Sequence, residues 1–473
     1  KSVGQLRGRL DELGLELPLD EAVLTAAAGS PLAAPLAVGG LKVGNRWCIH
    51  PMEGWDANRD GTPSEHTLRR WRNFGASGAK WIWGGEAAAV EEEGRANPRQ
   101  TLATAANRAG LANLLAELLD AHCAKFGTTD DLLLGLQLTH SGRFCRPSPS
   151  RPQPRIACHH PLLDARFGID PHDAAVVLTD SELERLIDRF VDAAVLAREV
   201  GFRLVDVKAC HGYLVHELLG AHTRPGPFGG DFDGRTRLLR TIVGRIRGEL
   251  PDLLVGVRLS VFDTVPYVTQ GATGRPAPHE HLLPYEFGFG VDPHNPLLPD
   301  LSEPIRLLVI LRDLGLAAVN LSCGSPYYSP HIQRPAAFPP SDGYPPPEDP
   351  LAGVVRQICA ARACKQAVPG LPMVGSGYSY LQDFLPHAAQ AVVRRGWIDA
   401  VGLGRMVLAY PELPADTLFT GRLQRKRVCR TFSDCTTAPR HGLVSGCYPL
   451  DAYYKALAEA EQLRHVKSTG KGE

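Results

Sequence analysis

Residues 205–240 read VDVKACHGYLVHELLGAHTRPGPFGGDFDGRTRLLR. The run begins as an apolar, strand-like segment and passes straight into Lys208, His211 and Tyr213. Ionisable side chains at the end of a buried strand are typical of a reaction site, because the carboxyl ends of parallel strands open onto one face of the fold. The stretch therefore predicts an α/β enzyme whose site lies at the ends of its strands.

Strand-like apolar runs alternate with segments of helical period along most of the chain, which indicates βα units around a parallel sheet. The eight expected strands span residues 46–52, 80–83, 132–138, 204–208, 253–259, 317–322, 372–375 and 398–403. The clearest helix follows Thr179, where Thr179 and Glu182 have the spacing of a capping box. Eight strands and eight helices predict a (β/α)8 TIM barrel with helical extensions at both ends.

The barrel is expected over residues 41–415. Residues 1–40 are predicted to form a helical extension that caps the barrel bottom or packs on a neighbour. Residues 416–473 contain several cysteines and an amphipathic helix over 450–467, followed by a polar tail, 468–473, that is expected to be disordered.

Composition narrows the class of protein. The chain has 473 residues, 44% of them hydrophobic, with 51 basic and 51 acidic side chains. Zero net charge gives no electrostatic reason to expect nucleic acid or an anionic membrane as a partner, so a small-molecule substrate is expected. No apolar run approaches the roughly 20 residues that span a bilayer, and no signal peptide is recognisable. The eleven cysteines are scattered, which is typical of free thiols in a reducing compartment. A cytoplasmic location is therefore expected.

The ends of the last two expected strands are rich in glycine. They read VGSGYS at 374–379 and GLGR at 402–405. Glycine lets backbone amides approach a ligand closely, and these two loops of a TIM barrel frequently bind phosphate. Either cluster alone is more typical of an ordinary turn, but together, with Arg405 to add a charge-assisted contact, they favour a phosphate site.

Several motifs together resemble the Old Yellow Enzyme family of flavin-dependent ene-reductases. They are HGYL at 211–214, HTRPGPFGG at 222–230, GRTRLL at 234–239, LQLTHSGR at 136–143, VRLS at 257–260 and the two glycine clusters, and they extend over roughly residues 40–415. The resemblance implies FMN across the barrel mouth, with NADH or NADPH as electron donor. The residues that it places against FMN are Pro51, Met52, Glu53, Ala87, Gln137, Arg258, Gly375, Ser376, Gly377, Gly404 and Arg405.

Within that set, the resemblance assigns Gln137 and Arg258 to the pyrimidine side of the flavin. The chemistry agrees, because a guanidinium stabilises the negative charge of a reduced flavin near N1 and a glutamine offers both a donor and an acceptor. The alternative is structural: Gln137 is then a buried polar residue of the barrel interior and Arg258 an ion-pair partner.

The resemblance also assigns catalytic roles to Lys208, His211 and Tyr213. The side chains at 208 and 211 would bind the carbonyl oxygen of an α,β-unsaturated substrate, and Tyr213 would supply a proton. Such donors polarise the alkene, so that hydride passes from flavin N5 to the β carbon and an acid protonates the α carbon. Tyr213 could instead be an ordinary packing residue at the start of a helix.

Two positions depart from the family pattern. Lys208 stands where histidine or another residue is usual in the family. Three functional roles are open to its cation: stabilising an enolate, binding a substrate carboxylate, or lowering the pKa of His211. The structural alternative is a salt bridge to a neighbouring acid such as Glu53 or Glu86. Glu53 stands where threonine or cysteine is usual, and it would either donate a hydrogen bond when protonated or lower the flavin potential when ionised. A Lys208–Glu53 pair is therefore a hypothesis that a distance can test.

Two long loops follow the fifth and sixth expected strands. Residues 264–298 are rich in proline, glycine and aromatic residues, as is typical of a lid or of a contact between copies of a homo-oligomer. Tyr327, Tyr328 and His331 are expected near the substrate, with at least one of them lining the pocket.

Three cysteines, Cys429, Cys435 and Cys447, lie near the C-terminus. Larger relatives bind an iron–sulfur cluster through four cysteines, the last two separated by eleven residues, as Cys435 and Cys447 are here. Val428 and Thr431 occupy the other two ligand positions, so free thiols are favoured over a cluster or a zinc site. We also expect no dinucleotide-binding domain of the kind that follows the cluster in those relatives.

The sequence thus predicts an FMN-dependent oxidoreductase that passes hydride from NAD(P)H to an electron-poor alkene. One alternative is a flavin-dependent dehydrogenase that oxidises an amine or another C–H bond on the same barrel. A second is a flavin-free aldolase or lyase with Lys208 as Schiff-base nucleophile, and a third is a catalytically silent barrel with a binding role.

Overall fold

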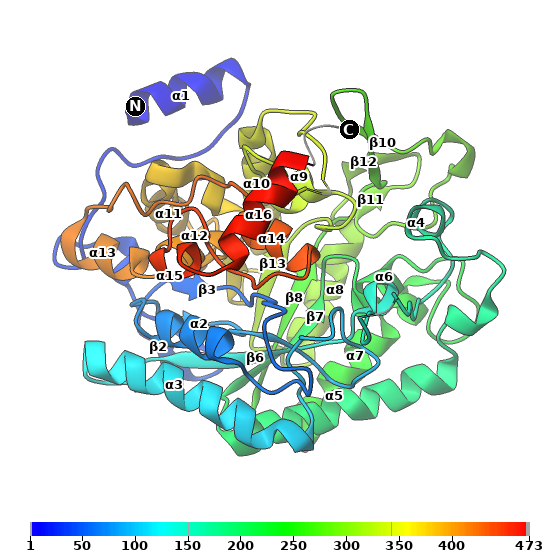
Figure 1. Cartoon of the computed structure of the whole chain (residues 1–473). Coiled ribbons are helices and arrows are strands. Elements are labelled where there is room, and N and C mark those ends of the chain that lie inside the picture. The colour runs from blue at the N-terminus through cyan, green and yellow to red at the C-terminus, as the bar shows by residue number, and fades with distance from the viewer. Residues whose placement is uncertain (1, 150, 342, 470–473) are drawn as a thin grey trace.

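Eight parallel strands form a closed ring in the computed structural model, which describes residues 2–149, 151–341 and 343–469 (Figure 1). Neighbours in the ring follow one another along the chain, and the pairing of the last strand with the first closes it. The strands are β3 (Trp47–Ile49), β4 (Trp81–Ile82), β6 (Leu133–Thr139), β7 (Leu204–Ala209), β8 (Leu254–Ser260), β13 (Ala318–Ser322), β14 (Met373–Gly375) and β15 (Ala400–Leu403). All eight expected strands are confirmed.

A helix follows each strand of the ring and covers its outside. These helices are α2 (Glu65–Gly75), α3 (Arg108–Phe126), α5 (Asp180–Val200), α7 (Phe232–Glu249), α8 (Ser302–Asp313), α10 (Pro350–Ala367), α11 (Leu385–Arg394) and α13 (Leu413–Thr420). Helix α5 begins as predicted, because Thr179 accepts from the Glu182 amide and the Glu182 side chain accepts from the Thr179 amide. Its apolar stripe, with Leu183 and Phe190, is fully buried in the core. The TIM barrel is confirmed.

An antiparallel hairpin, absent from the prediction, closes the amino-terminal end of the barrel. It consists of β1 (Leu36–Val38) and β2 (Leu41–Val43). Val38 and Val43 are fully buried with Leu204 and Leu254 from the beginnings of two ring strands. Helix α1 (Val3–Glu12) lies elsewhere, since Arg9 pairs with Asp349, the residue that caps α10. Within residues 1–40, the bottom is therefore capped by strand β1 and not by the predicted helix.

The long loop after β8 has secondary structure of its own. It forms two hairpins, β9 (Tyr267–Gln270) with β10 (Thr273–Pro276) and β11 (Val291–Asp292) with β12 (Asn295–Pro299). Its role as a lid or an oligomer contact stays a prediction. Besides short 3-10 turns, the barrel also contains strand β5 (Ala87–Ala89) and the short α-helices α4 (Pro161–Phe167), α6 (Leu214–Leu219), α9 (Pro330–Gln333) and α12 (Arg405–Ala409).

The C-terminal segment folds over the side of the barrel where the strands end (Figure 1). It contains α14 (Asp434–Arg440), α15 (Ala452–Lys455) and α16 (Glu459–Thr469). The single helix predicted over 450–467 is divided, because Asp451 caps a first short helix and Leu457 then packs against the small core around Tyr454. Residues 470–473 of the predicted disordered tail lie outside the described residues, and the proposed division of the chain at residue 415 stays a prediction.

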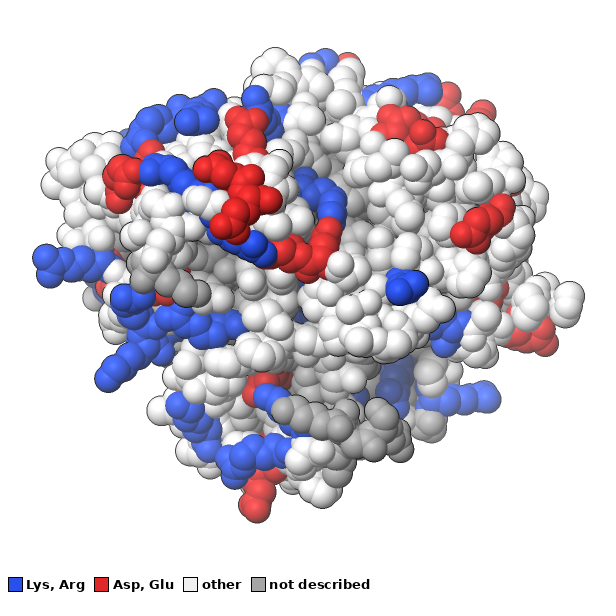
Figure 2. All heavy atoms as spheres, turned by 90° about the horizontal axis from the view of Figure 1, so that it is seen from above, with Lys and Arg blue, Asp and Glu red and all other residues white. Residues whose placement is uncertain are grey.

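Charged side chains of both signs are interspersed over the face that Figure 2 shows, in keeping with 51 basic and 51 acidic residues. None of the helices in the described residues has the length and apolar character that a membrane span requires.

Candidate active site

A cavity opens at the carboxyl ends of the ring strands, where this fold places active sites. Its volume is about 230 Å³, a little below the ~300–1,000 Å³ typical of ligand pockets, and it opens to solvent at the mouth. The ends of β3, β8, β13, β14 and β15 supply most of its lining, and the C-terminal segment adds Thr436 and Ser445. We call it the main cavity.

Most of the residues predicted to bind FMN line the main cavity. They are Pro51, Met52, Glu53, Arg258, Ser376, Gly377, Gly404 and Arg405. Gly375 ends β14 directly before them, whereas Ala87 and Gln137 are not part of the lining. Ala87 and Gln137 stand opposite each other in the parallel register of β5 and β6, and Gln137 Nε2 donates to the Asp206 carboxylate. Gln137 is therefore a buried polar residue with a partner inside the barrel, and its place at the flavin stays a prediction.

The described residues of this lining include six side chains with a buried polar atom that has no hydrogen-bond partner: Glu53 Oε1, Arg70 Nε, Arg258 Nε, Gln333 Oε1, Tyr378 Oη and Arg405 Nη1. A buried polar atom left unpaired costs about 1–3 kcal/mol, so a cluster of them in one cavity indicates a polar ligand. A methyl group at Gly404 would meet only His50 within 4 Å, at 3.9 Å, so the backbone beside Arg405 is open. An arginine next to open glycine backbone suits a phosphate, and the chemistry of these donors fits FMN.

The predicted Lys208–Glu53 pair is confirmed. Lys208 Nζ lies 3.0 Å from Glu53 Oε2 and 3.5 Å from the centre of the Tyr213 ring. Tyr213 donates its hydroxyl to the same carboxylate oxygen at 2.7 Å. Burial, reinforced by the Glu53 charge, raises the pKa of Tyr213 well above its usual value, so the phenol keeps its proton. Lys208 thus holds Glu53, and not Glu86, in a buried cluster with Tyr213.

A second ion-pair network fixes the loop that carries Glu53. Arg70 binds the carboxylates of Asp56 and Glu86, and the amide of Gly54 donates to Glu86 Oε1 at 3.2 Å. All three charged side chains are buried, and burial raises the pKa of Glu86 to about 7. Arg70 therefore positions the loop at 53–56, although nothing near it in the sequence marked it as part of the site.

His211 has a strained backbone with φ of +66°, and its side chain lines the main cavity. Its amide donates to Ser260 Oγ at 3.1 Å, and its Nε2 lies 2.9 Å from Ser322 Oγ. Burial holds the pKa of His211 well below its usual value, and the nearby Arg258 and Lys208 charges add to that effect. The imidazole is therefore neutral near pH 7.

The three residues predicted to bind substrate occupy different places. None of them is in the lining of the main cavity. Tyr327 reaches it indirectly, because its hydroxyl lies 3.0 Å from the Tyr213 hydroxyl. Tyr328 donates to Asp263 at 2.5 Å, and His331 Nδ1 lies 2.8 Å from the Tyr344 hydroxyl; neither partner is in this lining. Adjacency in the sequence did not indicate that the three residues would have such different surroundings.

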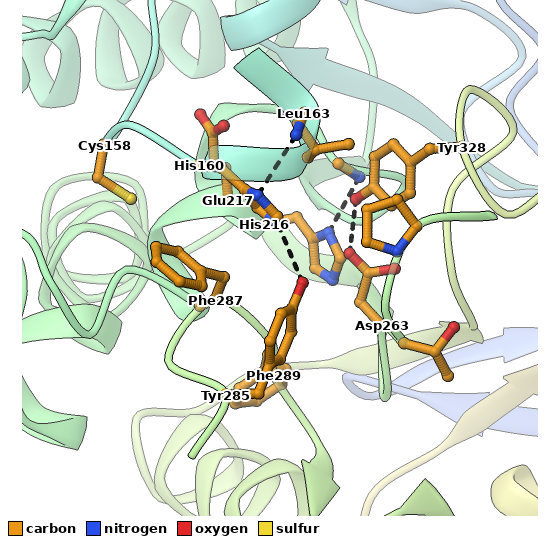
Figure 3. Close-up of a pocket in the computed structure, with 14 residues that line it drawn as sticks. Cys158, His160, Leu163, His216, Glu217, Asp263, Tyr285, Phe287, Phe289 and Tyr328 are labelled. Carbon is orange, nitrogen blue, oxygen red and sulfur yellow. Dashed lines mark hydrogen bonds between the residues drawn. The ribbon is translucent and has the colours of Figure 1, made fainter. Parts of the chain in front are cut away.

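Tyr328 lines a small cavity together with His216 and Asp263 (Figure 3), and its lining also includes Gly212, the residue after His211. The amide of Gly212 donates to His216 Nδ1 at 2.9 Å, which leaves the protonated His216 Nε2 without a partner. Asp263 accepts from Tyr328 with one oxygen and has no partner for Oδ1, and burial raises its pKa to about 7. The space of about 30 Å³ suits one or two ordered water molecules and not a substrate.

Sequence reasoning missed several residues of the main cavity, above all His50. Its Nδ1 lies 3.0 Å from Asn320 Nδ2 and its Nε2 lies 3.1 Å from Ser376 Oγ. The ring covers Gly402 so closely that a methyl group there would be 1.9 Å from His50 Cε1. The sequence feature that could have marked His50 as a site residue is its position near the end of an expected strand. For Gln333, Thr436 and Ser445 we find no such feature in the sequence.

The three C-terminal cysteines lie near one another at the edge of the main cavity, whose lining includes Cys435. Burial raises the pKa of Cys447 above its usual value, and the proximity of Cys435 and Cys429 raises it further. All eleven cysteines carry free thiols. Within the described ranges, no group of three or more His, Cys, Asp or Glu side chains is arranged to hold a metal ion.

Comparison with known proteins identifies a matching family and a shared fold. Residues 31–274, which are 244 of the 473, match the family described as NADH:flavin oxidoreductase / NADH oxidase. The chain is 24% identical over 297 residues to the NADH oxidase of Thermoanaerobacter brockii, covering 62% of this chain and 37% of that protein. It is 26% identical over 241 residues to an NADPH dehydrogenase of Geobacillus sp. (strain WCH70), covering 50% and 64%. The chain thus spans less than two thirds of the length of these relatives.

Solved structures with the same fold include a 2-naphthoyl-CoA reductase complex, with a TM-score of 0.65 and 18% identity over 90% of this chain and 57% of the other. Histamine dehydrogenase from Rhizobium sp. 4-9 has a TM-score of 0.63 and 21% identity, covering 88% and 52%. An old yellow enzyme homologue from Zymomonas mobilis has a TM-score of 0.57 and 21% identity, covering 85% and 96%. These likenesses show a common barrel.

Proposed function

The chain belongs to the NADH:flavin oxidoreductase / NADH oxidase family, and from that membership we propose that it is an FMN-dependent enzyme that passes hydride from NADH or NADPH to an electron-poor alkene. The observation that carries the proposal is the main cavity itself. Its lining combines unpartnered nitrogen atoms of Arg405 and Arg258 with the neutral side chain of His211, beside the Lys208–Glu53–Tyr213 cluster.

The residues present fit FMN. Arg405, Ser376, Gly377 and Gly404 would hold its phosphate, and Arg258 with Pro51 and Met52 would flank its ring system. When bound, FMN supplies a carrier that accepts hydride from NAD(P)H and delivers it to the acceptor. The other parts of the reaction belong to the protein.

His211 binds the acceptor without adding charge. Because its imidazole is neutral, it offers a ring N–H to a carbonyl oxygen and polarises the conjugated double bond. Tyr213 keeps its proton and shares it with Glu53, so its hydroxyl serves as the acid that protonates the α carbon. Tyr327, hydrogen-bonded to Tyr213, lies on the path by which that proton is replaced.

Lys208 acts through Glu53 and Tyr213. Its ammonium contacts the Glu53 carboxylate and the face of the Tyr213 ring at the same time. An ammonium engaged in this way has no lone pair with which to attack a carbonyl carbon, so the contact opposes the Schiff-base alternative. We infer that Lys208 balances the Glu53 charge and so holds the phenol in place.

Anaerobic reduction tests the proposal. NADH or NADPH should bleach the flavin of the FMN-loaded protein, and enones should reoxidise it. Tyr213→Phe should slow reoxidation by an enone about 10²–10⁴-fold and leave the rate of reduction unchanged. Failure of the protein to bind FMN, or reoxidation at the normal rate in Tyr213→Phe, would refute the assignment.

One observation favours a second candidate, oxidation of an amine. Glu53 Oε1 is buried in the main cavity without a partner, and a carboxylate oxygen in that situation would attract a substrate ammonium. The two candidates differ in the direction of hydride flow. Bleaching of the flavin by primary or secondary amines in the absence of NAD(P)H would support amine oxidation, whereas bleaching by NAD(P)H followed by enone reoxidation supports the first proposal.

A further inference from the structure

Gln333 lines the main cavity together with His211 and Ser322. It is the last residue of α9, on the loop that follows β13. Its side-chain oxygen, Oε1, is buried and has no hydrogen-bond partner. Because a buried acceptor left unpaired costs about 1–3 kcal/mol, this oxygen favours a ligand that brings an N–H or O–H donor.

The nitrogen of the same amide lies against His211. Gln333 Nε2 is 3.3 Å from His211 Nε2, and Ser322 Oγ is 2.9 Å from that ring nitrogen. An amide nitrogen carries two N–H groups and accepts no hydrogen bond. A ligand oxygen that binds next to His211 Nε2 is therefore within reach of an N–H of Gln333 as well.

The backbone at Gln333 is held from behind. The buried Gln357 donates through Nε2 to the backbone oxygens of Ile332 and Gln333, at 2.7 and 3.0 Å. Gln357 also lies against Gly377, where a methyl group would be 3.0 Å from Gln357 Cδ. Helix α9 is thus fixed to the loop that carries Gly377, and a residue fixed in this way loses little entropy when it binds a ligand.

Lys208 does not supply a second donor beside His211. Its ammonium contacts the Glu53 carboxylate and the Tyr213 ring, and Lys208 is not part of the lining of the main cavity. The sequence had assigned Lys208 and His211 together to a ligand oxygen. In the structure, Gln333 is the residue that places an N–H donor next to His211.

We propose that Gln333 recognises the carboxamide on the nicotinamide ring of NADH or NADPH. A primary carboxamide has one oxygen and two N–H groups, so it complements both ends of a glutamine amide. The carboxamide oxygen accepts from Gln333 Nε2 beside His211, and a carboxamide N–H donates to Gln333 Oε1. An enone has no N–H, so Gln333 distinguishes the hydride donor from the acceptor. The assignment rests on the proposed function, which brings the nicotinamide to the flavin in the main cavity.

Nicotinamide and 3-acetylpyridine test the site, because they differ only in the exchange of the amide NH2 for a methyl group. Each is titrated into the FMN-loaded protein, and the absorbance of the flavin reports binding. We expect nicotinamide to bind about three- to tenfold more tightly, which is the factor that one hydrogen bond is worth. Gln333→Met removes the amide and keeps the length of the side chain, so it should bring the two affinities within about twofold of each other. Gln462→Met, at an exposed glutamine outside the lining, should keep the difference.

The two halves of the reaction give a second readout. In anaerobic rapid mixing, Gln333→Met should slow reduction of the flavin by NADH or NADPH at least about threefold more than it slows reoxidation by 2-cyclohexenone. Only the nicotinamide loses a partner for its N–H in this variant.

The assignment is overturned if the parent protein binds both probes equally, if neither probe changes the flavin absorbance, or if Gln333→Met keeps the preference for nicotinamide. If Gln333→Met does not retain FMN, Gln333→Glu keeps an acceptor at the same position and should retain the preference; its loss there would also contradict the assignment. Failure of the proposed function looks different: a protein that binds nicotinamide in the predicted pattern but is not reduced by NAD(P)H keeps the site and refutes the reaction. Normal reduction and enone turnover with an unchanged nicotinamide preference in Gln333→Met keep the reaction and refute the role of Gln333.

Discussion

Replacing Lys208 by methionine removes the cation of the Lys208–Glu53 pair and preserves the length of the side chain. The joined atoms are 3.0 Å apart, and the two side chains are only 6% and 14% exposed, so water does not replace the lost partner. Removing one member of a buried pair costs about 3–5 kcal/mol, and the lost contact with the Tyr213 ring contributes up to about 2 kcal/mol of this. The Tyr213 hydroxyl still donates to Glu53, so we expect Lys208→Met to lower the free energy of unfolding by about 3 kcal/mol.

A double-mutant cycle separates the pair from its surroundings. Glu53→Gln leaves Lys208 buried without its counter-charge, whereas the double variant has neither charge. The double variant should therefore be more stable than Lys208→Met, with a coupling energy of about 2–3 kcal/mol. Urea denaturation followed by far-UV circular dichroism, with and without FMN, gives all four free energies.

A matched control is Arg198→Met, which breaks the exposed pair with Asp252 and should cause no measurable loss. The reasoning is refuted if Lys208→Met unfolds within about 0.5 kcal/mol of the parent protein, or if the two single changes simply add. Either result would mean that water reaches the pair and screens it.

Three further changes test other parts of the structure. Arg405→Gln should weaken FMN binding about tenfold or more, since a hydrogen bond to a charged group is worth about 1.5–3 kcal/mol, and quenching of flavin fluorescence measures the loss. Burial raises the pKa of Asp263 in the folded protein to about 7, above its usual value of 3.8. Its contribution to the free energy of unfolding is therefore complete below about pH 4, falls as the pH rises to about 7, and is constant at higher pH. Asp263→Asn should flatten the curve of unfolding free energy against pH between about pH 4 and pH 7. Gly402→Ala should lower the free energy of unfolding by about 1–3 kcal/mol, because its methyl group would lie 1.9 Å from the His50 ring. In a protein that already carries His50→Ala, the same change should cost much less. Thermal unfolding measures both losses, and equal losses would contradict this packing.

Local pattern accounts for the parts of the fold that were predicted correctly. The eight strands and the start of α5 follow from apolar periodicity and from the spacing of Thr179 and Glu182, which are properties of neighbouring residues. The β1–β2 hairpin was missed because its short strands carry no such period. At the site, the sequence allowed two roles for Gln137, and it did not indicate the contact of Gln137 with Asp206 that the structure shows.

The sequence alone predicted the order of strands and helices and the residue types at the end of each strand, because both depend on residues close together in the sequence. It did not predict which residues line each cavity. Lys208 meets Glu53 across 155 residues, and the C-terminal segment brings Arg440 beside Tyr327. Contacts between residues so far apart in the sequence depend on how the loops of the closed barrel pack against one another. Only the tertiary structure therefore decides which charges form pairs and which polar atoms are left without a partner.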